Sequence, residues 1–318
     1  MKAAAFLTIA FLLPISAATQ NPTPPRPPEK QAADISVNVE RHLVSFSVSD
    51  NKGKFITTLK KEDFKVYEDD KLQAVTNFSS ETDLPLAIAL LVDASGSILD
   101  KLRFEQEASI QFFSDTLKKG KDKAMVIAFD TQPELLQAFT DEQDKLSDAV
   151  RKIRSGGGTA MYDAIYVAIA DARFGLAKQD GRKVVILIGD GDDNNSRKSM
   201  SEMLEAAQKN DVAIYAISTN QAADFARPAQ QRGDKNLRRI TDDTGGRTFF
   251  PLKIQNLTQN FQEISQELRA QYTLAYAPTN SKADGTFRRI RVDVADKRYK
   301  ARTPTGYIAT RATTVSAK

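Results

Sequence analysis

Residues 86–97 read LAIALLVDASGS, an apolar run that ends in alternating oxygen-bearing side chains. The first seven residues are all apolar, which is typical of a strand covered on both faces of a sheet. One carboxylate and two hydroxyls follow on alternate residues, Asp93, Ser95 and Ser97. Alternation in an extended segment allows the three groups to converge on one point. Hard oxygen donors of this kind suit a cation such as Mg²⁺.

After this run, apolar strands alternate with amphipathic helices. Thr140 and Gln143 have the spacing of a capping box, which predicts a helix starting there. The alternation predicts an α/β fold, a Rossmann-like doubly wound and mostly parallel sheet. We expect strands at 86–92, 124–129, 135–139, 184–188 and 212–217, and helices at 102–117, 160–176, 237–243 and 257–268.

Shorter strands with turn residues between them precede and follow the α/β part. Val44, Phe46 and Val48 alternate with serines, and Ile290 and Val292 alternate with charged residues. Alternation predicts half-buried antiparallel strands. We expect the two β segments to pair into one sandwich-like module with the α/β domain inserted between them, because about fifty residues alone make a marginal core. Two independent β caps are the alternative.

The N-terminus has the features of a secretory signal. Lys2 precedes an apolar stretch that is too short to span a bilayer, and small residues follow it. An uncleaved anchor is the alternative. We expect an exported protein, periplasmic, envelope-associated or secreted, whose mature chain has no transmembrane span. The predicted division is signal peptide 1–18, proline-rich linker 19–33, β segment 34–82, α/β domain 83–268, β segment 269–312 and tail 313–318.

Composition excludes several classes of site. The 318 residues include no cysteine and one histidine, His42, so disulfides, thiolate zinc sites and multi-histidine metal sites are excluded. The net charge of +4 is mild. Basic residues gather near the C-terminus, where the alternating pattern favours a solvated strand face over nucleic-acid binding. We therefore expect no nucleic-acid partner.

Two later positions can complete the oxygen cluster. Thr159 follows a serine and three glycines and opens a predicted helix, and Asp190 follows a predicted strand. Ligands of open α/β sheets bind at the carboxyl ends of the strands, where all these residues fall. Asp93 and Ser95 could instead only cap the next helix. Capping explains neither Thr159 nor Asp190, so the five residues favour a metal site.

The set Asp-x-Ser-x-Ser, Gly-Gly-Thr and Asp-Gly, in this order and setting, resembles the von Willebrand factor type A domain. The resemblance covers about residues 83–268, and the five positions match the family's metal-ion-dependent adhesion site. The flanking segments Glu62-Asp63-Phe64 and Thr244-Gly245-Gly246-Arg247 resemble a bacterial exported subgroup of the family. The resemblance implies a divalent cation, usually Mg²⁺ with Ca²⁺ or Mn²⁺ as alternatives, bound by Asp93, Ser95, Ser97, Thr159 and Asp190.

The resemblance further implies a binding module. One coordination position stays open, and a Glu or Asp carboxylate of a protein partner fills it. Asp192, Asp193 and Asn194 follow Asp190 and could hold outer-shell water or a second cation, although such runs are more often solvated loops. No catalytic residue and no cofactor other than the cation are predicted.

Two other functions compete with that of a binding module. A metal-dependent hydrolase of the phosphatase type needs Asp-x-Asp, and Ser95 stands where the second aspartate would be. Ser95 as a nucleophile would need a nearby base, and His42 is the chain's single histidine. The alternative within the binding class is a structural or assembly component of a cell-envelope complex.

The polar stretch 219–236 is expected to emerge on the metal face, either to select the partner or as an insertion with no role.

Overall fold

The computed structural model describes residues 41–80, 84–96, 102–220, 228–251 and 256–309. All of them belong to the compact unit Val39–Lys318. The predicted signal peptide, linker and tail, at 1–18, 19–33 and 313–318, lie outside the described residues, and so does Ser97. No described helix is long and apolar enough to cross a membrane.

A six-stranded sheet forms the centre of the α/β part, with strand order β10-β9-β8-β5-β6-β7. All its pairings are parallel except that of the edge strand β7, which runs antiparallel to β6. The predicted doubly wound, mostly parallel sheet is confirmed. The strands are β5 (Leu86–Asp93), β6 (Lys123–Phe129), β7 (Pro133–Thr140), β8 (Arg182–Gly189), β9 (Val212–Ser218) and β10 (Thr248–Phe249).

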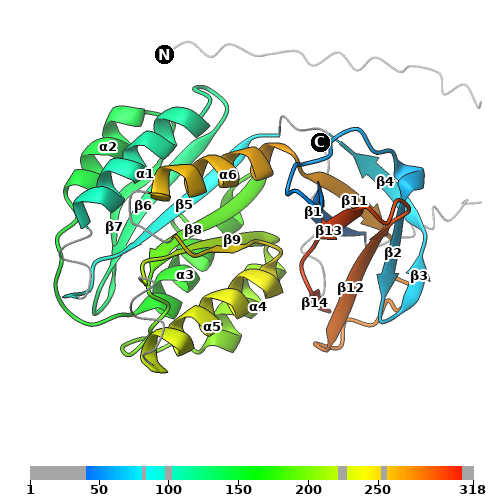
Figure 1. Ribbon diagram of the computed structural model, residues 1–318. Helices are drawn as coiled ribbons and strands as arrows, with labels where there is room; N and C mark the ends of the chain where they lie inside the picture. Colours follow the sequence, from blue (N-terminus) through cyan, green and yellow to red (C-terminus); the bar gives the residue numbers. More distant parts are fainter. Residues whose placement is uncertain (1–40, 81–83, 97–101, 221–227, 252–255, 310–318) are drawn as a thin grey trace, which may run out of the picture. The chain divides into compact units, whose positions relative to one another are not determined.

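Three helices cover each face of this sheet (Figure 1). Every residue of β5 is buried. Its side chains alternate between the two cores: Leu90 packs with α1, α2 and α6, whereas Leu91 packs with α3, α4 and α5. The helices are α1 (Leu102–Thr116), α2 (Gln143–Arg151), α3 (Met161–Ala170), α4 (Met200–Lys209), α5 (Pro228–Thr244) and α6 (Leu257–Arg269).

The remaining strands form two four-stranded antiparallel sheets, of order β13-β1-β11-β4 and β14-β12-β2-β3. Each sheet combines strands from before and after the α/β part, and side chains of both sheets form one hydrophobic core. The prediction of a single sandwich-like module is therefore confirmed, and two independent caps are excluded. Its strands are β1 (His42–Asp50), β2 (Phe64–Glu68), β3 (Lys71–Gln73), β4 (Val75–Ser79), β11 (Tyr272–Tyr276), β12 (Phe287–Val294), β13 (Tyr299–Arg302) and β14 (Gly306–Ile308).

The helix expected at 160–176 was too long. Helix α3 ends at Ala170, and Asp171 leaves the helical region with φ −57° and ψ 129°. The chain then turns back and places Leu176 in the core, where it is fully buried and opens a short 3₁₀ helix (Leu176–Lys178). The apolar content of the window therefore came from two separate segments.

Helix starts were also predicted imperfectly. Helix α2 has Glu142 as its N-cap, and Thr140 accepts a hydrogen bond from the Glu142 N–H instead of capping the helix. Helix α5 begins at Pro228, so residues 228–236 are helical and not a polar loop. Helix α4 was missed, although Ser199 and Glu202 form the capping box that announces it.

Polar side chains join the C-terminal end of α6 to its surroundings. The Arg182 guanidinium donates to the carbonyls of Leu268 (2.6 Å) and Gln271 (2.8 Å). Its positive charge is favourable at this position because the C-terminal end of a helix carries partial negative charge. Glu267, 1% exposed, accepts a hydrogen bond from Ser47 Oγ on β1. Arg302 on β13 lies 3.6 Å from the same carboxylate. The α/β part and the sandwich are thus connected by buried polar contacts at this point.

Candidate metal centre

Asp93 is the last residue of β5 and is 1% exposed. Its Oδ1 accepts a hydrogen bond from the Ser95 N–H at 2.8 Å. Its Oδ2 is buried and has no hydrogen-bond partner among the described residues. Buried carboxylate oxygens normally have partners, so Oδ2 is an open acceptor at the end of the strand.

Burial raises the pKa of the Asp93 carboxyl to about 6, and the neighbouring Asp190 contributes to the increase. Hydrogen bonding from Ser95 and from the backbone of Asp190 acts in the opposite direction. The neighbouring strand β8 ends at Gly189, where a Cβ atom would lie 3.3 Å from Asp93 Oδ2. The buried Asp93 carboxyl and the half-buried Asp190 therefore lie close together at this edge of the sheet.

Hydrogen bonds tie the loop after β5 to the glycine-rich loop before α3. The Gly156 N–H donates to the Ala94 carbonyl at 2.7 Å, and Ser155 Oγ donates to the Ser95 carbonyl at 2.8 Å. Thr159, 5% exposed, lies at the end of this glycine-rich loop. Predicted ligands 64 residues apart are thereby brought to the same edge of the sheet.

A third loop, after β8, is tied to the second. The Thr159 N–H donates to Asn194 Oδ1 at 2.9 Å, and the N–H groups of Asn194 and Asn195 both donate to the Thr159 carbonyl at 3.0 Å. Asp190 Oδ1 accepts a hydrogen bond from the Asp192 N–H at 3.0 Å, which closes a tight turn after the strand. The loops carrying Asp93, Ser95, Thr159 and Asp190 therefore form one hydrogen-bonded assembly.

Helix α5 packs directly against the loop that carries Asp190. Gly191 has φ +79°, and a Cβ there would lie 2.2 Å from the Gly233 carbonyl; a Cβ at Gly233 would lie 2.2 Å from the Asp190 carbonyl. Only glycine at both positions allows so close an approach. Asn220 Nδ2 also donates to the Asp190 carbonyl at 3.0 Å. Part of the stretch 219–236 thus holds the loop in place.

The two predicted outer-shell residues differ in their contacts. Asp193 Oδ2 accepts hydrogen bonds from the Tyr162 N–H and Ser196 Oγ, and Oδ1 accepts one from the Ser196 N–H. Asp193 therefore caps the first turn of α3. Asp192 is partly exposed beside it. The outer-shell role of both residues stays a prediction.

Sequence reasoning missed a fourth loop, which follows β6. A Cβ at Gly157 (φ +78°) would lie 2.6 Å from Thr131 Oγ1 and 2.9 Å from Asp130 Oδ2, so this loop packs closely against the glycine-rich one. Thr131 Oγ1 accepts a hydrogen bond from the Gly158 N–H at 3.1 Å. The rule that located Asp93 and Asp190, a polar residue at the carboxyl end of a parallel strand, applies equally to Asp130.

The donor set consists of carboxylates and hydroxyls. No group of three or more His, Asp or Glu side chains in the described part of the chain is arranged to hold a metal. Two carboxylates assisted by neutral hydroxyls match the oxygen ligands preferred by Mg²⁺ and similar hard cations. The unpartnered Asp93 oxygen, in particular, fits a ligand atom.

Family comparison agrees with this architecture. The model of the von Willebrand factor type A domain matches residues 87–267, more than half of the chain. The chain belongs to this family. Its type A domain comprises the six-stranded sheet and the helices on both faces, with the candidate metal centre at the carboxyl ends of β5 and β8.

Several solved structures are similar to this type A domain at low sequence identity. Proximal thread matrix protein 1 from the mussel byssus, with a zinc-occupied MIDAS motif, has a TM-score of 0.50 and 18% identity over 64% of this chain and 50% of that one. This chain thus matches about half of the mussel protein. BatB from Bacteroides thetaiotaomicron gives 0.44 and 16%, over 57% and 98% of the two chains.

A bacterial pilus protein also resembles this chain. The von Willebrand domain of the type V pili tip protein Mfa5 from Porphyromonas gingivalis gives a TM-score of 0.46 and 13% identity, over 57% of this chain and 94% of that one. No curated protein sequence matches the chain at a significant level.

Proposed function

We propose that this protein is a binding module that holds a divalent cation, Mg²⁺ in the first instance, and uses it to bind an acidic residue of a protein partner. The ligands would be Asp93, Ser95, Ser97, Thr159 and Asp190. The observation that carries the proposal is the buried Asp93 Oδ2, which has no hydrogen-bond partner in the described structure. A buried carboxylate oxygen without a donor is costly unless a cation completes its surroundings.

The charges of the donor set favour an anionic partner group. Two carboxylates balance the charge of a divalent cation, while neutral hydroxyls leave its Lewis acidity available. A bound cation would thus supply one electrophilic position for a carboxylate from outside. Asp93 and Asp190 would hold the cation, and the hydrogen-bonded loops that carry them would fix their geometry.

Hydrolysis is not supported by the groups around the site. His42 lies on β1 of the sandwich, where its ring stacks on Tyr307 at a centroid distance of 3.7 Å. His42 therefore lies in the sandwich and not in the loops that carry Asp93 and Asp190, so it is not placed to act as a base for Ser95. We also propose that the protein is exported and acts in the cell envelope or outside the cell. The alternative is a structural or assembly component of a cell-envelope complex that uses the same site.

The proposal is tested by recovery of binding partners from an envelope extract on the immobilised mature protein. We expect one or more proteins to be retained with Mg²⁺ and released by EDTA, and Asp190→Ala to retain none of them. Asp148→Asn, which removes an exposed carboxylate on α2, serves as the charge-matched control. Retention of the same proteins in EDTA or by Asp190→Ala would refute the cation-dependent mechanism.

A further inference from the structure

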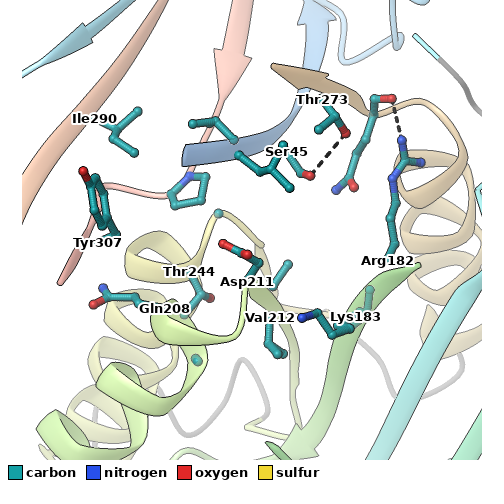
Figure 2. A pocket seen from close by; sticks show the side chains of 18 of the residues that line it. Ser45, Arg182, Lys183, Gln208, Asp211, Val212, Thr244, Thr273, Ile290 and Tyr307 are labelled. Atoms are coloured by element: carbon teal, nitrogen blue, oxygen red, sulfur yellow. Dashed lines mark hydrogen bonds between the residues drawn. The ribbon is translucent and has the colours of Figure 1, made fainter. Parts of the chain in front are cut away.

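A pocket of about 250 Å³ lies at the junction between the type A domain and the sandwich. We call it the junction pocket. Figure 2 shows Lys183, Gln208, Asp211 and Val212 on the type A side, and Ser45, Thr273, Ile290 and Tyr307 on the sandwich side. Its volume is slightly below the ~300–1,000 Å³ typical of ligand sites, which suits a small molecule. Apolar side chains contribute much of the lining: Val44, Val184, Val212, Ile290, Pro304 and Tyr307.

Close backbone contacts build the wall of the junction pocket. Three glycines line it, and at each a Cβ atom would overlap a neighbour: 2.3 Å from the Pro85 carbonyl at Gly181, 2.7 Å from the Pro304 ring at Gly245, and 2.1 Å from the Arg288 carbonyl at Gly306. The chain is therefore tightly packed at these three positions of the wall.

Asp211 occupies a position where glycine would fold more easily. It follows the C-cap of α4 and has φ +51°, in the left-handed region. Helices commonly end on glycine at this position because a side chain adds strain there. The carboxyl group faces the junction pocket (Figure 2) and makes no hydrogen bond or ion pair with any described residue. The strained aspartate thus presents an unused negative charge to the cavity.

Lys183 on β8 supplies the opposite charge. Its side chain lines the same pocket and forms no hydrogen bond or ion pair within the described residues. Asp211 is exposed to solvent, whereas Lys183 is half-buried. Burial lowers the pKa of Lys183, and the attraction of Lys183 by Asp211 and by Asp180 opposes this shift. The two groups therefore attract each other without forming an ion pair, and each keeps its hydrogen-bonding capacity for a ligand.

The other charged or titratable groups of the pocket are engaged or neutral. The Arg182 guanidinium donates to the carbonyls of Leu268 and Gln271. Burial lowers the pKa of His42 to about 4, so its ring is neutral at pH 7. The Tyr307 hydroxyl donates to Glu68 Oε2 at 2.9 Å. Asp211 and Lys183 are thus the charges that the pocket offers to a ligand.

We propose that the junction pocket binds a small zwitterion with an apolar body, of the chemistry of a free amino acid with an apolar side chain. The ligand's ammonium group would bind Asp211 and its carboxylate Lys183. Its side chain would lie among Val212, Ile290 and Tyr307. This site is separate from the candidate metal centre and does not depend on the cation.

The test is calorimetric titration of the mature protein with L-leucine and L-phenylalanine in EDTA. We expect at least one of them to bind, and its analogue lacking the carboxylate or the amine to bind at least about tenfold more weakly. The analogues are isopentylamine and 4-methylpentanoate for leucine, and phenethylamine and 3-phenylpropanoate for phenylalanine. Absence of binding by both amino acids at millimolar concentration would overturn the proposal, as would equal binding of the amine or the acid.

Variants distinguish the site from general adsorption. Asp211→Asn keeps a residue that tolerates a positive φ and removes the charge, and Lys183→Gln removes the other charge. Each should weaken amino-acid binding at least about tenfold, whereas Asp148→Asn should bind as the wild type does. Asp211→Gly should lose binding while its unfolding temperature stays equal or rises, which excludes misfolding as the cause. Unchanged affinity in Asp211→Asn and Lys183→Gln would overturn the assignment.

Discussion

Replacing Asp93 with asparagine is expected to abolish the stabilisation of the protein by Mg²⁺ while leaving the metal-free protein at least as stable as the wild type. Without a cation, the Asp93 carboxyl is 1% exposed, has one unpartnered oxygen and lies near Asp190. A buried carboxyl group beside a second carboxyl group is disfavoured in its charged form. Asparagine keeps the shape and the acceptor for the Ser95 N–H but removes the charge that a cation needs.

The measurement is thermal unfolding followed by circular dichroism, in EDTA and in Mg²⁺. A ligand at one hundred times its dissociation constant stabilises the native state by about 2.7 kcal/mol, and this gain should vanish in Asp93→Asn. Asp115→Asn on the exposed side of α1 is the matched control and should keep the Mg²⁺ response. A variant that still responds to Mg²⁺, or that is strongly destabilised in EDTA, would indicate that Asp93 acts as a helix cap and not as a ligand.

The largest expected effect on stability is that of Asp122→Ala. The Asp122 side chain is fully buried and forms an ion pair with Arg269 at the end of α6. Its two oxygens also accept hydrogen bonds from the N–H groups of Leu86 (2.9 Å) and Lys118 (2.8 Å). Truncation leaves the Arg269 charge without its partner, and breaking a buried pair on one side costs about 3–5 kcal/mol.

Urea unfolding measures this loss. Asp122→Asn should cost less than Asp122→Ala, because the amide retains an acceptor and similar volume. Arg269 also donates to the Thr116 carbonyl at 3.1 Å, so it stays anchored in both variants. A loss below about 1 kcal/mol in Asp122→Ala, the range of exposed ion pairs, would show that the pair does not hold α6 against the start of β5.

Sequence patterns predicted the central sheet well because its strands are buried on both faces. The run Leu86–Val92 has no polar residue, and its place in the middle of a parallel sheet is what such a run requires. The sandwich was also predictable in outline, because alternation at Val44 and Ile290 marks half-buried strands. Which strands pair with which was not predictable, since β1 lies between β11 and β13, more than 200 residues away.

Helix limits were harder to predict because burial in α5 does not follow hydrophobicity. Gly233 and Asp234 face inward, the first against the Asp190 loop and the second in hydrogen bonds with Ser218 and Asn220. A helix whose buried positions are glycine and aspartate has little apolar periodicity at its start. The proline at position 228 was the available signal, because proline favours the first turn of a helix.

The candidate metal centre was predicted from residue type and position after strands, since hydroxyls and carboxylates at strand ends are unusual in a core. The supporting residues Asp130 and Thr131 were not predicted, and neither were the hydrogen bonds between Asn194 and Thr159, because a linear pattern does not display backbone hydrogen bonds. The unpartnered charges of Asp211 and Lys183 likewise depend on tertiary structure, because their pocket is built from both parts of the chain.

The most direct test of the account is the anomalous difference density of Mn²⁺ in crystals of the mature protein, with Mn²⁺ standing in for Mg²⁺. We expect one strong peak in direct contact with oxygen atoms among Asp93, Ser95, Ser97, Thr159 and Asp190, and no peak there in crystals of Asp190→Ala. The account would be contradicted by well-ordered wild-type crystals, soaked at a saturating Mn²⁺ concentration, that show no peak at these residues.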